Sequence, residues 1–147
     1  LAKKCFCLNE NPNHTLESIL APNAGVTYLQ SDCDAELLIT VGFTTLVKLN
    51  AIRIVAPSMT QAPASVKIFL NKSASINFDN VASLKPDQTA ELTTESYNSD
   101  RASTIQLQAF KFTKVDTLTL YISSNLEDMD TTCISRLVFI GAAPNVR

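Results

Sequence analysis

Apolar and polar residues alternate in several short stretches of this chain. Residues 37–43 carry an apolar side chain at every odd-numbered position, and residues 66–70 and 117–123 carry one at every even-numbered position. Side chains of a β-strand point alternately to its two faces, so each stretch predicts a strand with one face in a core and the other in solvent.

Two further stretches change their apolar phase part of the way along. In residues 47–56 the apolar positions are odd-numbered up to Leu49 and even-numbered from Ile52. A strand keeps one face buried through such a change only if an extra residue is inserted. We therefore predict a β-bulge near residues 50–51 and, on the same grounds, a second one within residues 105–112.

One short helix is predicted near the amino terminus. Thr15 suits its N-cap, Glu17 suits the positive end of its dipole, and residues 22–25 contain the proline and glycine that end it. Its apolar face comprises Leu16, Ile19 and Leu20. We expect this helix to cover one end of a β core.

The remaining segments give weaker patterns. Residues 80–84 suggest a turn of helix, residues 90–92 a short edge strand, and residues 93–103 a mobile polar loop. Residues 134–141 are apolar at both parities, which is typical of a central strand covered on both faces.

Seven or eight short strands at spacings near ten residues, with almost no helix, predict an all-β fold of the β-sandwich class. The chain has 147 residues, of which 46% are hydrophobic and 18% charged. A globular chain of this length buries roughly 70% of the surface that it exposes when unfolded. We therefore expect one domain over residues 1–147, with no internal repeat and no linker.

Charge and hydropathy exclude several kinds of partner. The formal net charge is −2 and the twelve basic residues are scattered, so no phosphate-binding footprint is present and we expect no nucleic acid partner. No apolar run approaches the ~20 residues that span a membrane, and the first residues do not resemble a signal peptide. We expect no membrane partner, a cytoplasmic and nuclear location, and reduced thiols at the four cysteines.

The densest group of acidic side chains precedes the first predicted strand. Asp32, Asp34 and Glu36 alternate with other residues just before residue 37. They are candidate partner-binding residues for a basic protein surface, because charges at an interface provide steering and register. The alternative is a solvated turn in which the carboxylates bind nearby backbone amides.

Other combinations of reactive residues give weaker hypotheses. Cys5, Cys7, Cys33 and His14 include the donor types that bind zinc, but a Cys-x-Cys spacing is too short for most structural sites, so we expect no metal. His14 is the single histidine and no nucleophile elbow or phosphate loop is present, so we expect no enzyme and no catalytic residue.

A polar pocket for a sugar or peptide is a further possibility. Arg53 and Arg136 lie in strand-like stretches and could meet Tyr28 or Tyr121 in the fold. Fold analogy alone is weak support for such a function.

Several motifs along the chain resemble one family. Cys5-Phe6-Cys7-Leu8-Asn9-Glu10, the acidic stretch 29–39 and the two Val-Lys stretches at residues 47–49 and 66–71 resemble the PITH domain, the proteasome-interacting module of thioredoxin-like proteins. The closing residues 131–141 resemble the family's last strand. The resemblance covers about nine-tenths of the chain, and it departs from the family pattern at Ala35, where an acidic residue is usual.

This resemblance implies a jelly-roll β-sandwich similar to galactose-binding-like domains. It also implies a non-enzymatic module, without cofactor, that docks a thioredoxin-like protein onto the regulatory particle of the 26S proteasome, and we expect the module to be a monomer. The alternative function is a carbohydrate- or small-ligand-binding jelly roll, although the chain has no Trp and only three Tyr.

Overall fold

The computed structural model describes residues 2–20, 26–72 and 75–142. Its strands are β1 (Ala2–Leu8), β2 (Leu29–Gln30), β3 (Leu37–Val55), β4 (Ser65–Leu70), β5 (Gln88–Glu91), β6 (Ala102–Gln106), β7 (Val115–Ile122), β8 (Cys133–Ile134) and β9 (Arg136–Ala142). Its helical elements are α1 (Leu16–Leu20) and the 3-10 turns η1 (Met59–Gln61), η3 (Val81–Ser83) and η4 (Thr94–Ser96).

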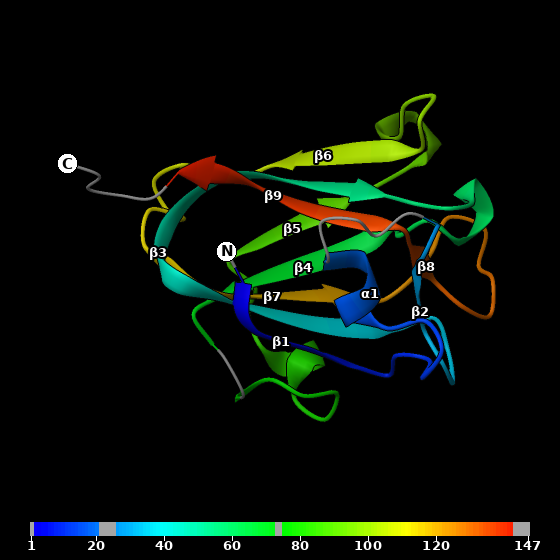
Figure 1. Cartoon of the computed structure of the whole chain (residues 1–147), viewed down its shortest axis with the longest axis horizontal. Helices are drawn as coiled ribbons and strands as arrows, with labels where there is room; N and C mark the ends of the chain where they lie inside the picture. Colours follow the sequence, from blue (N-terminus) through cyan, green and yellow to red (C-terminus); the bar gives the residue numbers. More distant parts are fainter. Residues whose placement is uncertain (1, 21–25, 73–74, 143–147) are drawn as a thin grey trace.

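Two antiparallel layers form a β-sandwich, and the long strand β3 belongs to both. The larger layer has the order β1-β3-β7-β4-β5, and the smaller layer places β3 between β6 and β9. Figure 1 shows β6 and β9 on one side of the molecule and β1 and β7 on the other. The short strands β2 and β8 form a separate pair at one end.

The core lies between the inner faces of these layers. Ile39 and Val41 of the larger layer and Ile52 and Ile54 of the smaller layer belong to one buried apolar cluster. Helix α1 contributes buried side chains to the same cluster, as its apolar face predicted. The all-β prediction is confirmed.

Strand β3 confirms one predicted bulge and joins two predicted strands into one. The predicted strands at residues 37–43 and 47–56 are a single strand of 19 residues. Its pairing with β9 shifts register between Leu49 and Ala51, so the predicted bulge is present. The second predicted bulge is wrong: β6 ends at Gln106, and residues 107–113 leave the sheet in a turn.

The structure exchanges the predicted exposures of β7 and β9. Strand β7 was expected to be half exposed, yet Thr119 and Tyr121 on its outer face are buried, because β7 lies between β3 and β4 and is covered by residues 75–84. Strand β9 was expected to be covered on both faces, yet among the described strands it pairs only with β3, and Ile140 is 41% exposed.

The covering segment also buries the outer face of β3 near its start. Leu38 is 1% exposed and packs with Phe69, Ile76 and Val81 in a second apolar cluster. The first half of β3 is therefore buried on both faces, not on one as the alternation predicted.

The weaker predictions have mixed outcomes. The helical turn expected at residues 80–84 and the short edge strand expected at residues 90–92 are confirmed as η3 and β5. The loop expected at residues 93–103 is wrong in part, because it contains η4, the buried Tyr97 and the start of β6.

Helix α1 begins after Thr15, as predicted, but a different residue satisfies its first amide. The carboxylate Oε1 of Glu10 accepts a hydrogen bond from Leu16 N at 2.9 Å, and an acidic acceptor suits the positive end of a helix. The predicted helix end at residues 22–25 lies outside the described residues. Within the described residues, no helix has the length and apolar character needed to cross a membrane.

Candidate functional site

The acidic stretch forms a loop that one asparagine organises. Asn9 Nδ2 donates hydrogen bonds to Asp34 Oδ1 at 2.9 Å and to the carbonyl oxygen of Glu36 at 2.7 Å. Asn9 Oδ1 accepts one from Cys33 N at 3.1 Å. Asn9 adopts φ 72°, a left-handed conformation that Asn tolerates better than most residues. Asn9 directly follows β1, so a residue far away in the sequence holds the loop in this conformation.

A second loop is organised by another asparagine. Asn125 is 6% exposed, and its Nδ2 lies within hydrogen-bonding distance of the carbonyl oxygens of Met129 and Thr131 and of Thr132 Oγ1. Asn125 Oδ1 accepts a hydrogen bond from Met129 N at 2.7 Å. Asp128, at φ 55°, takes the left-handed position of this turn.

Hydrogen bonds join the two loops beside the β2 and β8 pair. Thr132 Oγ1 donates to the carbonyl oxygen of Ala35 at 2.7 Å, and Thr132 N donates to Ser31 Oγ at 2.8 Å. Ser31 and Thr132 are fully buried. The loops therefore hold a fixed position relative to each other, at the right-hand end of Figure 1.

An acidic groove of about 590 Å³ lies between these loops. Its lining comprises Asp32, Cys33, Asp34, Ala35, Asp128, Met129, Asp130 and Thr131. All four aspartates are exposed, and the lining contains no basic and no aromatic residue. We call this feature the acidic groove.

The three predicted partner-binding residues are divided by the structure. Asp32 and Asp34 line the acidic groove, whereas Glu36 does not. Glu36 Oε1 accepts a hydrogen bond from Tyr121 Oη at 2.9 Å. Burial, this hydrogen bond and the charges of Glu36 and Asp34 together raise the pKa of Tyr121 to about 12. Glu36 thus links the acidic loop to the central strand.

The sequence did not indicate that residues 125–130 lie beside the first acidic loop. Asp128 and Asp130 are separated from Asp32 and Asp34 by most of the chain, and only the fold brings them together. The available signal was the closing Thr-Thr stretch, since Thr132 makes the contacts that join the loops.

The hypothetical zinc donors are dispersed. Cys33 is exposed in the acidic groove, Cys5 and Cys7 pack against the core from β1, and the ring of His14 stacks on Tyr28 with centroids 4.1 Å apart. Among the described residues, no group of three or more His, Cys, Asp and Glu side chains is arranged to hold a metal ion. Burial raises the pKa of Cys7, and it raises the pKa of Cys133 to about 11.

The predicted pocket of arginines and tyrosines does not form with Tyr121. Arg53 and Arg136 lie on the outer face of the smaller layer, because their neighbours Ile52, Ile54 and Leu137 point into the core. Tyr121 lies on the outer face of the larger layer, beside Leu38. The two layers separate Tyr121 from these arginines, so the version of the pocket with Tyr121 is wrong. The version with Tyr28, whose ring stacks on His14, stays a prediction.

The fold resembles that of solved galactose-binding-like modules. A CBM32 module of Clostridium perfringens in complex with GalNAc-β-1,3-galactose matches with a TM-score of 0.70 at 9% identity over 94% of each chain. The family 32 CBM of C. perfringens NanJ in complex with galactose matches with a TM-score of 0.67 at 9% identity over 92% of this chain and 91% of that chain. This protein therefore has the jelly-roll β-sandwich fold of these modules.

Sequence comparison narrows the class to one family. The model of the PITH domain matches residues 2–147, so the chain belongs to the PITH domain family. It is 33% identical over 137 residues to thioredoxin-like protein 1 of Schizosaccharomyces pombe, covering 92% of this chain and 47% of the relative. It is 34% identical over 140 residues to PITH domain-containing protein CG6153 of Drosophila melanogaster, covering 92% and 62%. The chain spans about half to two thirds of these relatives.

Proposed function

We propose that this chain is a non-catalytic docking module that attaches a thioredoxin-like protein to the regulatory particle of the 26S proteasome, and that the acidic groove makes the contact. Membership of the PITH domain family and the similarity to a thioredoxin-like protein support the proposed assembly. The proposed module acts as a monomer in the cytoplasm and nucleus.

The observation that carries the proposal is the arrangement of the four groove carboxylates. They come from two loops that buried or half-buried amides hold in place, so little conformational entropy is lost when a partner binds. A lining with four aspartates and no basic residue fits a basic protein surface.

The groove gives the carbohydrate alternative no support. The matched CBM32 modules were solved with sugars, but identities of 9% show the fold alone. Ligand pockets commonly contain aromatic side chains with a few convergent polar groups, and the lining of the acidic groove has no aromatic residue.

Co-sedimentation of the purified chain with purified 26S particles tests the proposal. Asp130 is exposed and makes no side-chain hydrogen bond to the described residues, so Asp130→Lys changes charge without removing a structural contact. We expect it to weaken binding about tenfold at low salt and less at high salt, because screening reduces the contribution of exposed charges.

Asp116→Lys is the matched control, since Asp116 is equally exposed but lies at the start of β7, away from the groove. Equal losses from both variants would show that only net charge matters. Absence of wild-type binding would refute the docking function itself.

A further inference from the structure

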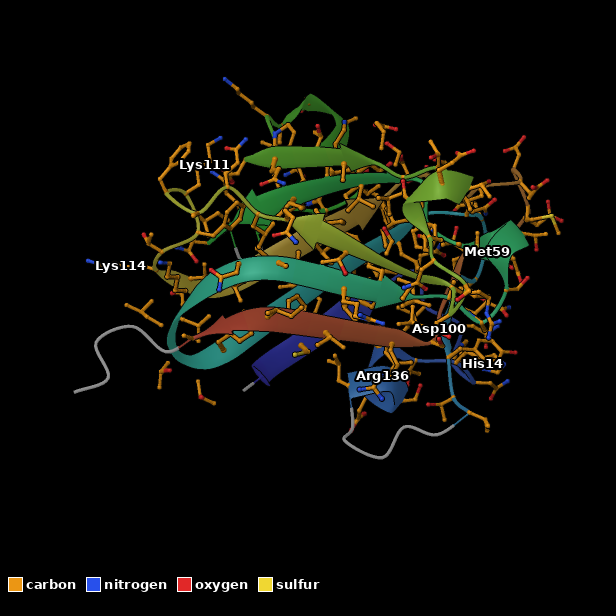
Figure 2. The ribbon with its side chains drawn as sticks, turned by 90° about the horizontal axis from the view of Figure 1, so that it is seen from above. His14, Met59, Asp100, Lys111, Lys114 and Arg136 are labelled. Atoms are coloured by element: carbon orange, nitrogen blue, oxygen red, sulfur yellow. The ribbon has the colours of Figure 1, made fainter. Side chains whose placement is uncertain are left out.

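The outer face of the smaller layer is a second candidate surface. Along β3, β6 and β9, successive side chains point alternately into the core and away from it. One set of side chains therefore faces outward. This set includes Arg53, Val55, Thr104, Arg136, Val138 and Ile140. Figure 2 looks onto this face, with β6, β3 and β9 nearest the viewer and Arg136 at its edge.

No described element covers this face, in contrast to the outer face of the larger layer. There, residues 75–84 bury Leu38, Phe69 and Tyr121 to 8% exposure or less. On the smaller layer, Ile140 is 41% exposed, Val55 and Val138 remain half-buried, and Thr104 is exposed. The face combines apolar side chains with access for a partner.

The charges on this face have one sign. Residues 48–55, 102–106 and 136–142, which build the three strands, include Lys48, Arg53 and Arg136 but no Asp or Glu. The side chains of Arg53 and Arg136 make no hydrogen bond or ion pair to any other described residue. Arg53 is half-buried between its cross-strand neighbours Thr104 and Val138, so its guanidinium is restricted in position but has no acceptor.

We propose that this face binds an acidic segment of a partner protein that presents carboxylates and apolar side chains on the same side of an extended chain. Guanidinium groups form paired hydrogen bonds with carboxylates, so the carboxylates of such a segment meet Arg53 and Arg136. The exposed Ile140 and the adjacent Val138 bury apolar side chains of the same partner.

The chemistry of the face favours a protein over other anionic partners. Single-stranded nucleic acid is usually held by aromatic side chains that stack on bases, and the outward set contains none. Anionic membranes attract clusters of basic residues, whereas this face spaces two arginines among apolar side chains. The surface is separate from the acidic groove and does not depend on the proposed function.

Titration of the ¹⁵N-labelled chain with an eight-residue peptide that has Glu and Val in turn at its odd-numbered positions and Ser at its even-numbered positions tests this inference by nuclear magnetic resonance, because an extended form presents Glu and Val on the same side. We expect amide shifts to map to β6, β9 and the second half of β3. Arg136→Glu should lower the peptide's affinity about tenfold, because a carboxylate then faces the acidic probe. Arg53→Gln, which removes the charge but keeps a polar side chain, should also lower the affinity.

Lys114→Glu changes the net charge as much as Arg136→Glu does but lies outside the three strands, so it should change affinity less than about twofold. Shifts elsewhere, equal losses from Arg136→Glu and Lys114→Glu, or no shifts at millimolar peptide would overturn the inference. Tighter, Arg136-dependent binding of oligothymidine or of phosphatidylserine vesicles would overturn it too, by assigning the face to another class of partner.

Discussion

Single amide side chains determine the shape of the acidic groove. Asn9 holds the loop that carries Asp32 and Asp34, and Asn125 holds the loop that carries Asp130. The sequence identified the first aspartates because they are close together in the chain. It could not show which distant residues hold them, because the hydrogen-bond partners of an asparagine side chain depend on the fold.

Replacing Asn125 by Ala should destabilise the fold by about 2 kcal/mol, because the buried amide of Asn125 is lost and the carbonyl oxygens of Met129 and Thr131 and the Met129 amide lose their partner. Urea denaturation measures the difference. Asn13→Ala is the control, since Asn13 is exposed and its side chain makes no hydrogen bond to the described residues, so it should change stability by less than about 0.5 kcal/mol. Equal effects would contradict this role of Asn125.

The Tyr121 hydroxyl provides a pH test of the contact between Glu36 and β7. The pKa of Tyr121 is raised to about 12 by burial first and then by Glu36 and Asp34, so the ring should remain protonated at pH 11. Glu36→Gln removes one nearby negative charge and should lower this pKa. The ¹³C chemical shift of the labelled tyrosine ring follows the titration, and an unchanged pKa in the variant would contradict the contact.

The same pKa shift predicts how stability depends on pH. The Tyr121 pKa is higher in the folded state than in the unfolded state, so the folded state binds the proton more tightly above pH 10. The stabilisation is complete below pH 10 and is lost as pH rises towards 12. Tyr121→Phe should make stability fall less steeply across this window, as measured by chemical denaturation at each pH.

At the level of strands, alternation predicts some features well and misplaces others. The phase change at residue 50 predicted the bulge in β3 because a bulge is a local feature of one strand. Alternation failed for β7 because Thr40 and Thr119 are both buried on the outer face, where their hydroxyls lie 3.5 Å apart. Buried polar pairs of this kind look like solvent-facing positions in a sequence.

For β9, the apolar pattern predicted too much burial. Residues 134–141 look like a covered strand, but β9 lies at the edge of the smaller layer, and Ile140 faces outward. Sequence patterns report which side chains are apolar, and they cannot report whether another element or a partner covers them. The outer face of β9, which the pattern predicted to be covered, is part of the exposed outer face of the smaller layer.

Gly141 tests how closely β9 approaches β3. A Cβ atom at this position would lie 1.9 Å from the carbonyl oxygen of Lys48, so Gly141→Ala forces the two backbones apart. We expect a loss of about 1–3 kcal/mol in the free energy of unfolding. A Gly→Ala change in an open position stabilises by roughly 0.4–1 kcal/mol, so a more stable variant would contradict this close approach.

At the level of the whole molecule, charge is separated between two surfaces. The acidic groove has four aspartates and no basic residue in its lining, whereas the strands of the smaller layer contain basic residues and no acidic ones. A net charge of −2 conceals this division, and the scattering of the basic residues along the sequence did not indicate a basic face. Such an arrangement suits a module that contacts two different protein surfaces.

The exposed thiol of Cys33 allows the proposed groove contact to be tested directly. Cys33 lies in the lining of the groove, so a benzophenone maleimide attached there reports what approaches the aspartates. A Cys33→Ser, Thr89→Cys variant carries the same group on the exposed Thr89 of the edge strand β5. Irradiation with purified 26S particles should cross-link Cys33, but not position 89, to a subunit of the regulatory particle. Cross-links from position 89 and none from Cys33 would contradict the account.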